Sequence, residues 1–140
     1  MKNYEFIEHT ADVGIRVYGK DLKSLFKNVA VALFSLIVEF SHQPDKDQER
    51  IVRLEAETYE DLLINWLNEL ISVFFTYKFL PKSYNINISE GLPRLEARLT
   101  GAIYDPYSKP INMEIKAATY HNLKIERDSQ GFRAEIIFDV

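Results

Sequence analysis

The segment LKSLFKNVAVALFSLI, residues 22–37, decides the fold because its apolar side chains recur at steps of three and four. This spacing predicts an amphipathic helix with its apolar face towards the core. Ala32, Leu36 and Val38 widen the apolar stripe, so we expect the helix to be buried on more than one side. The residues that repeat at the helical spacing are Leu22, Leu25, Phe26, Val29, Ala30, Leu33, Phe34 and Ile37.

Around this helix the sequence alternates between apolar and polar residues, as strands do. Two strands are predicted before it, over residues 4–8 and 13–18, and a third after it, over residues 49–57. Asp21 is placed to cap the first turn of the helix. We expect the helix to end near Phe40-Ser41, where a polar loop begins.

A second amphipathic helix follows the third strand. Residues 58–61, Thr-Tyr-Glu-Asp, resemble a capping box whose acids suit the positive end of a helix dipole. The helix should end near Leu80, because Pro81 disfavours helical conformation in the residue before it. Trp66 and the helix phenylalanines are interpreted as core residues rather than as a stacking platform.

The rest of the chain predicts strands over residues 84–88 and 95–99, and a hairpin of residues 119–126 with 132–139 around the turn Asp128-Ser129-Gln130-Gly131. The order is therefore β-β-α-β-α followed by four or five strands. It predicts an α+β fold, a single-domain sandwich of two amphipathic helices and a largely antiparallel sheet over residues 1–140.

Composition excludes several classes of function. The chain has a net charge of −4 and a pI of about 5.4, so we expect no direct, stable binding of nucleic acid. It has no cysteine, and neither a signal peptide nor an apolar stretch long enough to span a bilayer is recognised. A cytoplasmic protein is expected. No Walker A, Gly-x-Gly-x-x-Gly, Gly-x-Ser-x-Gly or His-Glu-x-x-His motif is present.

The segment His9-Thr10-Ala11-Asp12-Val13-Gly14 places an imidazole and a carboxylate where two strands join. Asp139, beside Val140, supplies a second carboxylate from the last predicted strand. Carboxylates held together repel unless a cation or protons intervene, and oxygen donors suit Ca²⁺, Mg²⁺ or Mn²⁺. In the alternative interpretation Asp12 accepts backbone hydrogen bonds in a turn, His9 supports that turn, and Asp139 is a solvated chain end.

A second group of polar side chains lies in the segment 116–121, where Lys116, Thr119, Tyr120 and His121 bring an amine, a hydroxyl, a phenol and an imidazole to the entry of a predicted strand. The alternative is a sheet edge whose polar residues face water. A small hydrolase that uses His9 or His121 with Asp12 is one functional hypothesis from these residues.

Several segments together resemble the archease family. They are residues 9–15, Leu25-Phe26 with Ala32-Leu33-Phe34, residues 116–121 and the closing Phe138-Asp139-Val140. The resemblance implies a non-enzymatic accessory protein of the RtcB-type RNA ligase, which joins tRNA halves in tRNA splicing. Family members promote guanylylation of the ligase and its multiple turnover.

The family's metal site, usually calcium-binding, carries over onto Asp12, Asp139 and a main-chain oxygen of Val140, with Ca²⁺ expected and Mg²⁺ or Mn²⁺ as alternatives. His9, Lys116 and His121 would support the site or face the partner. This sequence departs from many relatives at Gly101-Ala102, where they carry Gly-Glu, and residues 105–110 lack a His. A further alternative is a chaperone or modulator of RNA-modifying enzymes that acts by protein contact without metal.

Overall fold

The computed structural model describes residues 2–8, 12–39, 48–89, 91–105 and 110–140. The two helices are α1 (Leu22–Ile37) and α2 (Tyr59–Tyr77). The strands are β1 (Tyr4–Glu8), β2 (Val13–Gly19), β3 (Gln48–Glu55), β4 (Phe79–Ile88), β5 (Arg94–Ile103), β6 (Ala117–Thr119), β7 (Glu126–Asp128) and β8 (Gly131–Asp139). This order and the α+β class confirm the prediction.

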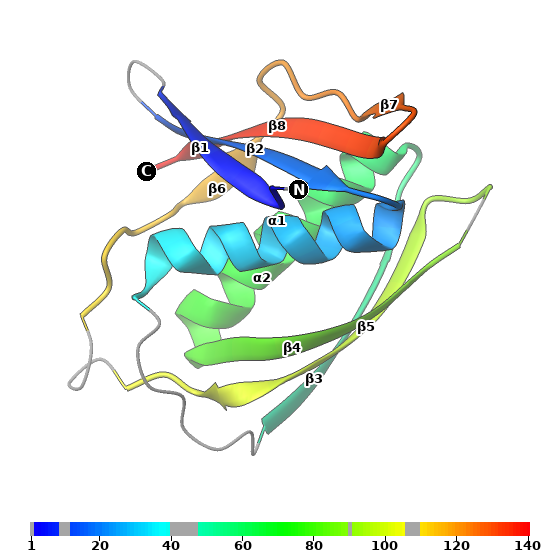
Figure 1. Cartoon of the computed structure of the whole chain (residues 1–140). Coiled ribbons are helices and arrows are strands. Elements are labelled where there is room, and N and C mark those ends of the chain that lie inside the picture. The colour runs from blue at the N-terminus through cyan, green and yellow to red at the C-terminus, as the bar shows by residue number, and fades with distance from the viewer. Residues whose placement is uncertain (1, 9–11, 40–47, 90, 106–109) are drawn as a thin grey trace.

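The strands form two antiparallel sheets with both helices between them (Figure 1). One sheet has the order β1-β2-β8-β6, with β7 also pairing with β8, and the other has the order β3-β5-β4. The antiparallel pairing is as predicted, but the division into two sheets was not indicated by the sequence pattern. Because each helix has a sheet on either side, its apolar stripe must be wide.

The core confirms the predicted apolar faces. Ala32 and Val38, which widen the stripe, are buried, as are the residues at the helical spacing except Leu22, which is half-buried like Leu36. Trp66 on α2 is fully buried, and its indole Nε1–H donates to the carbonyl oxygen of Phe26 on α1 at 3.0 Å. This bond ties the two helices together. In the described ranges no helix is both long enough and apolar enough to cross a bilayer.

The N-terminal caps of both helices are confirmed. The Asp21 carboxylate accepts the Ser24 N–H at 2.8 Å, and the Thr58 hydroxyl accepts the Asp61 N–H at 3.0 Å. Each bond satisfies a main-chain donor that has no partner inside its own helix.

Both helices end earlier than predicted. α1 ends at Ile37 rather than near Phe40-Ser41, because Val38 is already extended. α2 ends at Tyr77 rather than near Leu80, because Lys78 adopts a left-handed conformation with φ of 59°. Pro81 lies inside β4, an edge strand, beside an irregularity in its pairing with β5. An edge position tolerates the missing N–H of proline.

The prediction of a single strand over residues 119–126 is wrong. The chain forms two short strands instead, β6 and β7, and both pair with β8. Asn122, with φ of 54°, lies in the turn between them. The predicted hairpin turn at residues 128–131 is confirmed, since Asp128 pairs with Gly131.

Candidate metal site

The two predicted metal-binding carboxylates lie at the same end of neighbouring strands. β2 and β8 are antiparallel, and Val13 pairs with Phe138. Asp12 immediately precedes Val13 and Asp139 immediately follows Phe138, so both residues stand one step beyond this pair. Side chains at opposite positions of such a pair lie about 5 Å apart at Cβ. The topology therefore brings together residues that are far apart in sequence.

Alternation along β8 places the Asp139 carboxylate on the outward face of the sheet. Arg16 and Glu135 mark that face, because they are opposite each other and form an ion pair at 3.1 Å. Asp139 is four residues from Glu135 along β8 and so lies on the same face, whereas Asp12 immediately precedes β2. Arg16 also pairs with Glu5 at 2.9 Å. In the middle of this face Arg16 is thus shared by two acids, and Lys2 also contacts Glu5 at 3.2 Å.

The main chain around Asp139 is fixed on its other side by β6. Asp139 pairs with Ala117, and the Lys116 N–H donates to the Asp139 carbonyl oxygen at 2.8 Å. The Thr119 hydroxyl donates to the carbonyl oxygen of Ile137 at 3.0 Å. Asp139 and Val140 are both exposed, so the Asp139 carboxylate is open to an ion or to a partner.

Asn68 on α2 is a supporting residue that the sequence reasoning missed. Its Oδ1 accepts the Ala118 N–H at 2.8 Å, and its Nδ2 lies 3.5 Å from the Ala118 carbonyl oxygen. It holds the outer edge of β6, and β6 in turn borders Asp139. The signal available in the sequence was a polar amide, Asn68, between the apolar residues Leu67 and Leu70 of a predicted helix.

The predicted supporting residues differ in how near they lie to Asp139. Lys116 is next to the site through its main chain, and its side chain is exposed. His121 lies in the turn after β6, which runs away from the end of the sheet that carries Asp139. The hydrolase hypothesis paired His121 with Asp12, and this register does not bring the two together. His9, like the polar loop residue His42, lies outside the described residues.

The chemistry of the residues fits a hard cation held in an open site. Two carboxylates and a main-chain oxygen fall short of the 6–8 oxygen ligands that Ca²⁺ takes. Among residues 2–8, 12–39, 48–89, 91–105 and 110–140, no group of three or more His, Asp or Glu side chains is arranged to hold a metal ion. An ion between Asp12 and Asp139 would therefore need water or another molecule to complete its coordination.

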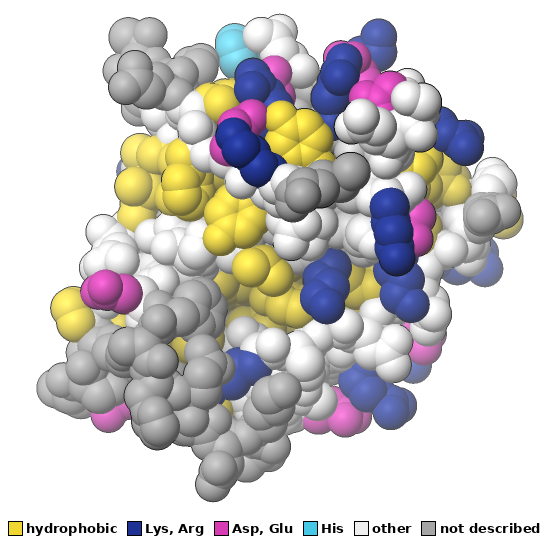
Figure 2. Space-filling model, viewed as in Figure 1, with side chains coloured by type: hydrophobic (Ala, Val, Ile, Leu, Met, Phe, Trp, Pro, Cys, Tyr) yellow, Lys and Arg dark blue, Asp and Glu magenta, His cyan; other side chains and the backbone are white. Residues whose placement is uncertain are grey.

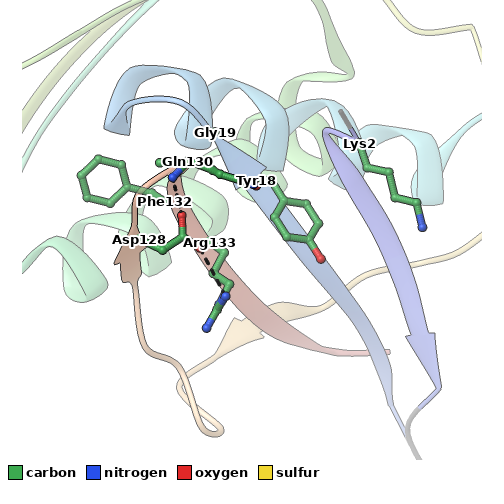
Figure 3. Close-up of a pocket in the computed structure, with 8 residues that line it drawn as sticks. Lys2, Tyr18, Gly19, Asp128, Gln130, Phe132 and Arg133 are labelled. Atoms are coloured by element: carbon green, nitrogen blue, oxygen red, sulfur yellow. Dashed lines mark hydrogen bonds and ion pairs between the residues drawn. The ribbon is translucent and has the colours of Figure 1, made fainter.

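A pocket of about 280 Å³ lies at the opposite end of the same sheet (Figure 3). Tyr18 and Gly19, at the end of β2, line it together with the turn before β8. In Figure 3 the ring of Phe132 points away from Tyr18 and Lys2. Because β2 begins beside Asp12 and ends at this pocket, the two regions are separated by the length of the strand.

Residues 4–140 match the Archease protein family (MTH1598/TM1083). The archease of Pyrococcus abyssi is 37% identical over 143 aligned positions, which cover the whole of both chains. The archease of Methanosarcina mazei is 35% identical over 144 positions, covering 99% of this chain and 97% of that protein.

Two solved structures share the fold over almost the whole chain. The solution structure of protein 1598 from Methanobacterium thermoautotrophicum has a TM-score of 0.86 and 30% identity, and it covers all of both chains. The crystal structure of a Thermotoga maritima archease, described as a possible chaperone, has a TM-score of 0.66 and 26% identity, covering 96% of this chain and 94% of that one. With sequence and fold in agreement along its length, this chain belongs to the archease family.

Proposed function

We propose that this protein is a non-enzymatic accessory protein that activates an RtcB-type RNA ligase during tRNA splicing. In this role it promotes guanylylation of the ligase and its multiple turnover. Membership of the archease family supports an accessory role, as does the description of the Thermotoga maritima relative as a possible chaperone. A cytoplasmic location, with the ligase as the main partner, is part of the proposal.

The observation that supports the proposal is the register of β2 with β8, which sets Val13 opposite Phe138, one residue from Asp12 and one from Asp139. Here Asp12, Asp139 and a main-chain oxygen of Val140 would hold Ca²⁺, or Mg²⁺ or Mn²⁺, against the partner. A bound cation of this kind supplies charge stabilisation to phosphate groups. The protein's own residues hold the ion at the surface, and their incomplete ligand set leaves room for ligands from a partner.

The test uses a purified RtcB-type ligase, guanosine triphosphate and RNA halves, with ligase limiting so that several turnovers are needed. We expect wild-type protein to raise both the guanylylated fraction of the ligase and the yield of joined RNA. Asp12→Asn and Asp139→Asn should lower the stimulation by about tenfold or more, the loss expected when a charged ligand is removed.

Asp128→Asn is the matched control, because Asp128 lies at the other end of β8 and its Oδ1 accepts the Gln130 N–H, a bond that asparagine can keep. Stimulation should be unchanged in this variant. If all three variants stimulate equally well, the carboxylate pair has no part in activation. A complete lack of stimulation by wild-type protein would contradict the proposed partner itself.

A modulator that acts by protein contact alone is the second candidate, and the description of the Thermotoga maritima relative favours it. The same experiment separates the two. If contact alone is responsible, Asp12→Asn and Asp139→Asn should retain full stimulation. A chelator should also leave the stimulation unchanged, where stimulation is the ligase activity with the accessory protein divided by the activity without it.

A further inference from the structure

A hollow of about 430 Å³ opens between the two sheets, where α1 begins and β4 ends. Lys20 and Lys23 line it from the start of α1, and Arg127 from β7. Asn87 and Ser89, at the end of β4, complete its polar lining. Lys20 follows the last residue of β2, whereas Asp12 precedes the first, so this hollow and the candidate metal site share no residue and lie at opposite ends of the strand.

Among the residues that line this hollow, three are cations and one, Asp21, is an acid. Within the described part of the chain, Lys20, Lys23 and Arg127 form no ion pair with an acidic side chain. Most other arginines do pair with acids. Those paired arginines are Arg16, Arg53, Arg94, Arg98 and Arg133.

Asp21 offsets one of the three positive charges. Its carboxylate also caps α1 by accepting the Ser24 N–H, and it keeps its negative charge in doing so. Lys and Arg side chains gather over the first turns of α1 in Figure 2. Since the chain as a whole carries −4, this local excess of positive charge runs against the average charge of the protein. A concave site lined by one sign of charge concentrates counter-ions of the other sign.

Lys23 lies at the positive end of the α1 dipole, where Asp21 supplies the N-cap carboxylate. Lys23 lies in the first turn of α1, which contains no acid, whereas the first turn of α2 contains Glu60 and Asp61. A cation at the positive end of a helix dipole is unfavourable, and an anion there is favourable. The two helices thus place their acids differently: α1 has one at its N-cap, Asp21, and α2 has two in its first turn.

The walls of the hollow are built and held in place. Arg127 lies over the ring of Phe132, with its guanidinium carbon 5.4 Å from the ring centre. Tyr59 on α2 donates to the carbonyl oxygen of Ser89 at 2.7 Å and so anchors the end of β4. Ile86 and Ile88 add apolar lining. The volume is in the range of small-ligand sites, which start at about 300 Å³.

We propose that this hollow binds the phosphate group of a mononucleotide-sized ligand. Lys20, Lys23 and Arg127 contact the phosphate oxygens, and Asn87 and Ser89 donate hydrogen bonds to the remaining polar atoms. This site goes beyond the accessory role proposed above and does not depend on it, because it needs neither the metal site nor the ligase.

The test is a titration of the isolated protein followed by amide resonances in ¹H–¹⁵N spectra, at about 50 mM salt so that charge is little screened. The probes are inorganic phosphate, guanosine monophosphate and guanosine. We expect saturable shifts at the amides of Leu22 and Lys23 with the two phosphate-bearing probes, and none with guanosine. Shifts that do not saturate, or that guanosine reproduces, would overturn the proposal.

Charge-reversal variants identify the site. Lys23→Glu should weaken binding of guanosine monophosphate by about tenfold or more, as expected for loss of a charged hydrogen bond. Lys27→Glu is the matched control, because Lys27 is exposed one turn further along α1 and does not line the hollow. It makes the same change in net charge, and binding should stay within about twofold of wild type. Equal losses in the two variants would show only general charge attraction.

A further arm distinguishes a small ligand from the end of an RNA strand. Short oligonucleotides with and without a 5′-phosphate are titrated in the same way. Tighter binding of guanosine monophosphate than of either oligonucleotide supports the assignment. If both oligonucleotides bind equally and more tightly than the mononucleotide, the hollow recognises a nucleic-acid backbone and the assignment to a mononucleotide is wrong.

Discussion

Asn68 on α2 binds both main-chain polar groups of Ala118 on β6, accepting its N–H at 2.8 Å and placing Nδ2 3.5 Å from its carbonyl oxygen. β6 is the edge of its sheet, so the carboxamide takes the place of a neighbouring strand. Ala118 is opposite Phe138, the residue before Asp139. A helix residue therefore helps to position the strand end that carries the candidate metal ligand.

Replacing Asn68 by leucine should destabilise the protein by about 1–3 kcal/mol, because it leaves two nearly buried main-chain groups without their partner. The free energy of unfolding in urea measures the loss. Asn65→Leu is the control, since Asn65 is exposed on the same helix, and it should change stability by less than about 0.5 kcal/mol. Equal stability of the two variants would mean that Asn68 does not hold β6.

The contact between Trp66 and Phe26 joins the helices, so its loss should reduce stability more than a loss of volume alone. Trp66→Phe removes the indole N–H that donates to Phe26 at 3.0 Å and part of a fully buried ring, at a cost of about 2–4 kcal/mol. Phe34→Leu shrinks a buried ring without loss of a hydrogen bond and should cost about half as much. Because Trp66 is the only tryptophan, unfolding is followed by circular dichroism.

Glu5 should make stability depend on pH in the acid range. Hydrogen bonds from Tyr18, Lys2 and Arg16 lower the pKa of Glu5 from about 4.5 to about 2. Since the pKa is lower in the folded state than in the unfolded state, the stabilisation is complete above pH 4.5 and is lost as the pH falls towards 2. The difference in melting temperature between wild type and Glu5→Gln should shrink over this window. Glu114→Gln, at an exposed position, should show no such trend.

The α+β class could be predicted because local patterns carry it. The three- and four-residue spacing of residues 22–37 gives a helix, and Asp21 and Thr58 mark where the two helices begin. The helix ends were missed because they depend on single backbone conformations, such as the left-handed Lys78. The split of 119–126 into β6 and β7 was missed because β8 is long enough to pair with both, which is a property of the assembled sheet.

For the candidate site, the sequence indicated the chemistry but not the arrangement. Asp12 and Asp139 were recognised as oxygen donors, and their joint placement follows from the pairing of β2 with β8. Periodicity shows that both segments are strands, but it does not show which strands are neighbours. The role of Asn68 is equally a tertiary property, because its partner lies 50 residues further along the chain.

Gly101 is required by close packing rather than by an unusual backbone conformation. A Cβ at this position would overlap the carbonyl oxygen of Leu80, next to the irregular pairing at Pro81. Gly101→Ala should therefore cost about 3 kcal/mol, because a main-chain atom cannot rotate away. Gly91→Ala meets no atom within 4 Å, although its φ is 84°, and should cost only about 1 kcal/mol. Urea unfolding of both variants compares steric overlap with backbone strain.

Calcium should stabilise the isolated protein through Asp12 and Asp139, because any ligand that binds only the folded state raises its stability with concentration. At a concentration of one hundred times the dissociation constant, the gain is about 2.7 kcal/mol, measured as a rise in melting temperature over a chelator-treated sample. Asp12→Asn and Asp139→Asn should each abolish most of the rise, whereas Asp128→Asn, at the other end of β8, should keep it. Parallel titrations with Mg²⁺ and Mn²⁺ identify the preferred ion. A rise that persists in both site variants would place the ion elsewhere, and this outcome is independent of any ligase assay.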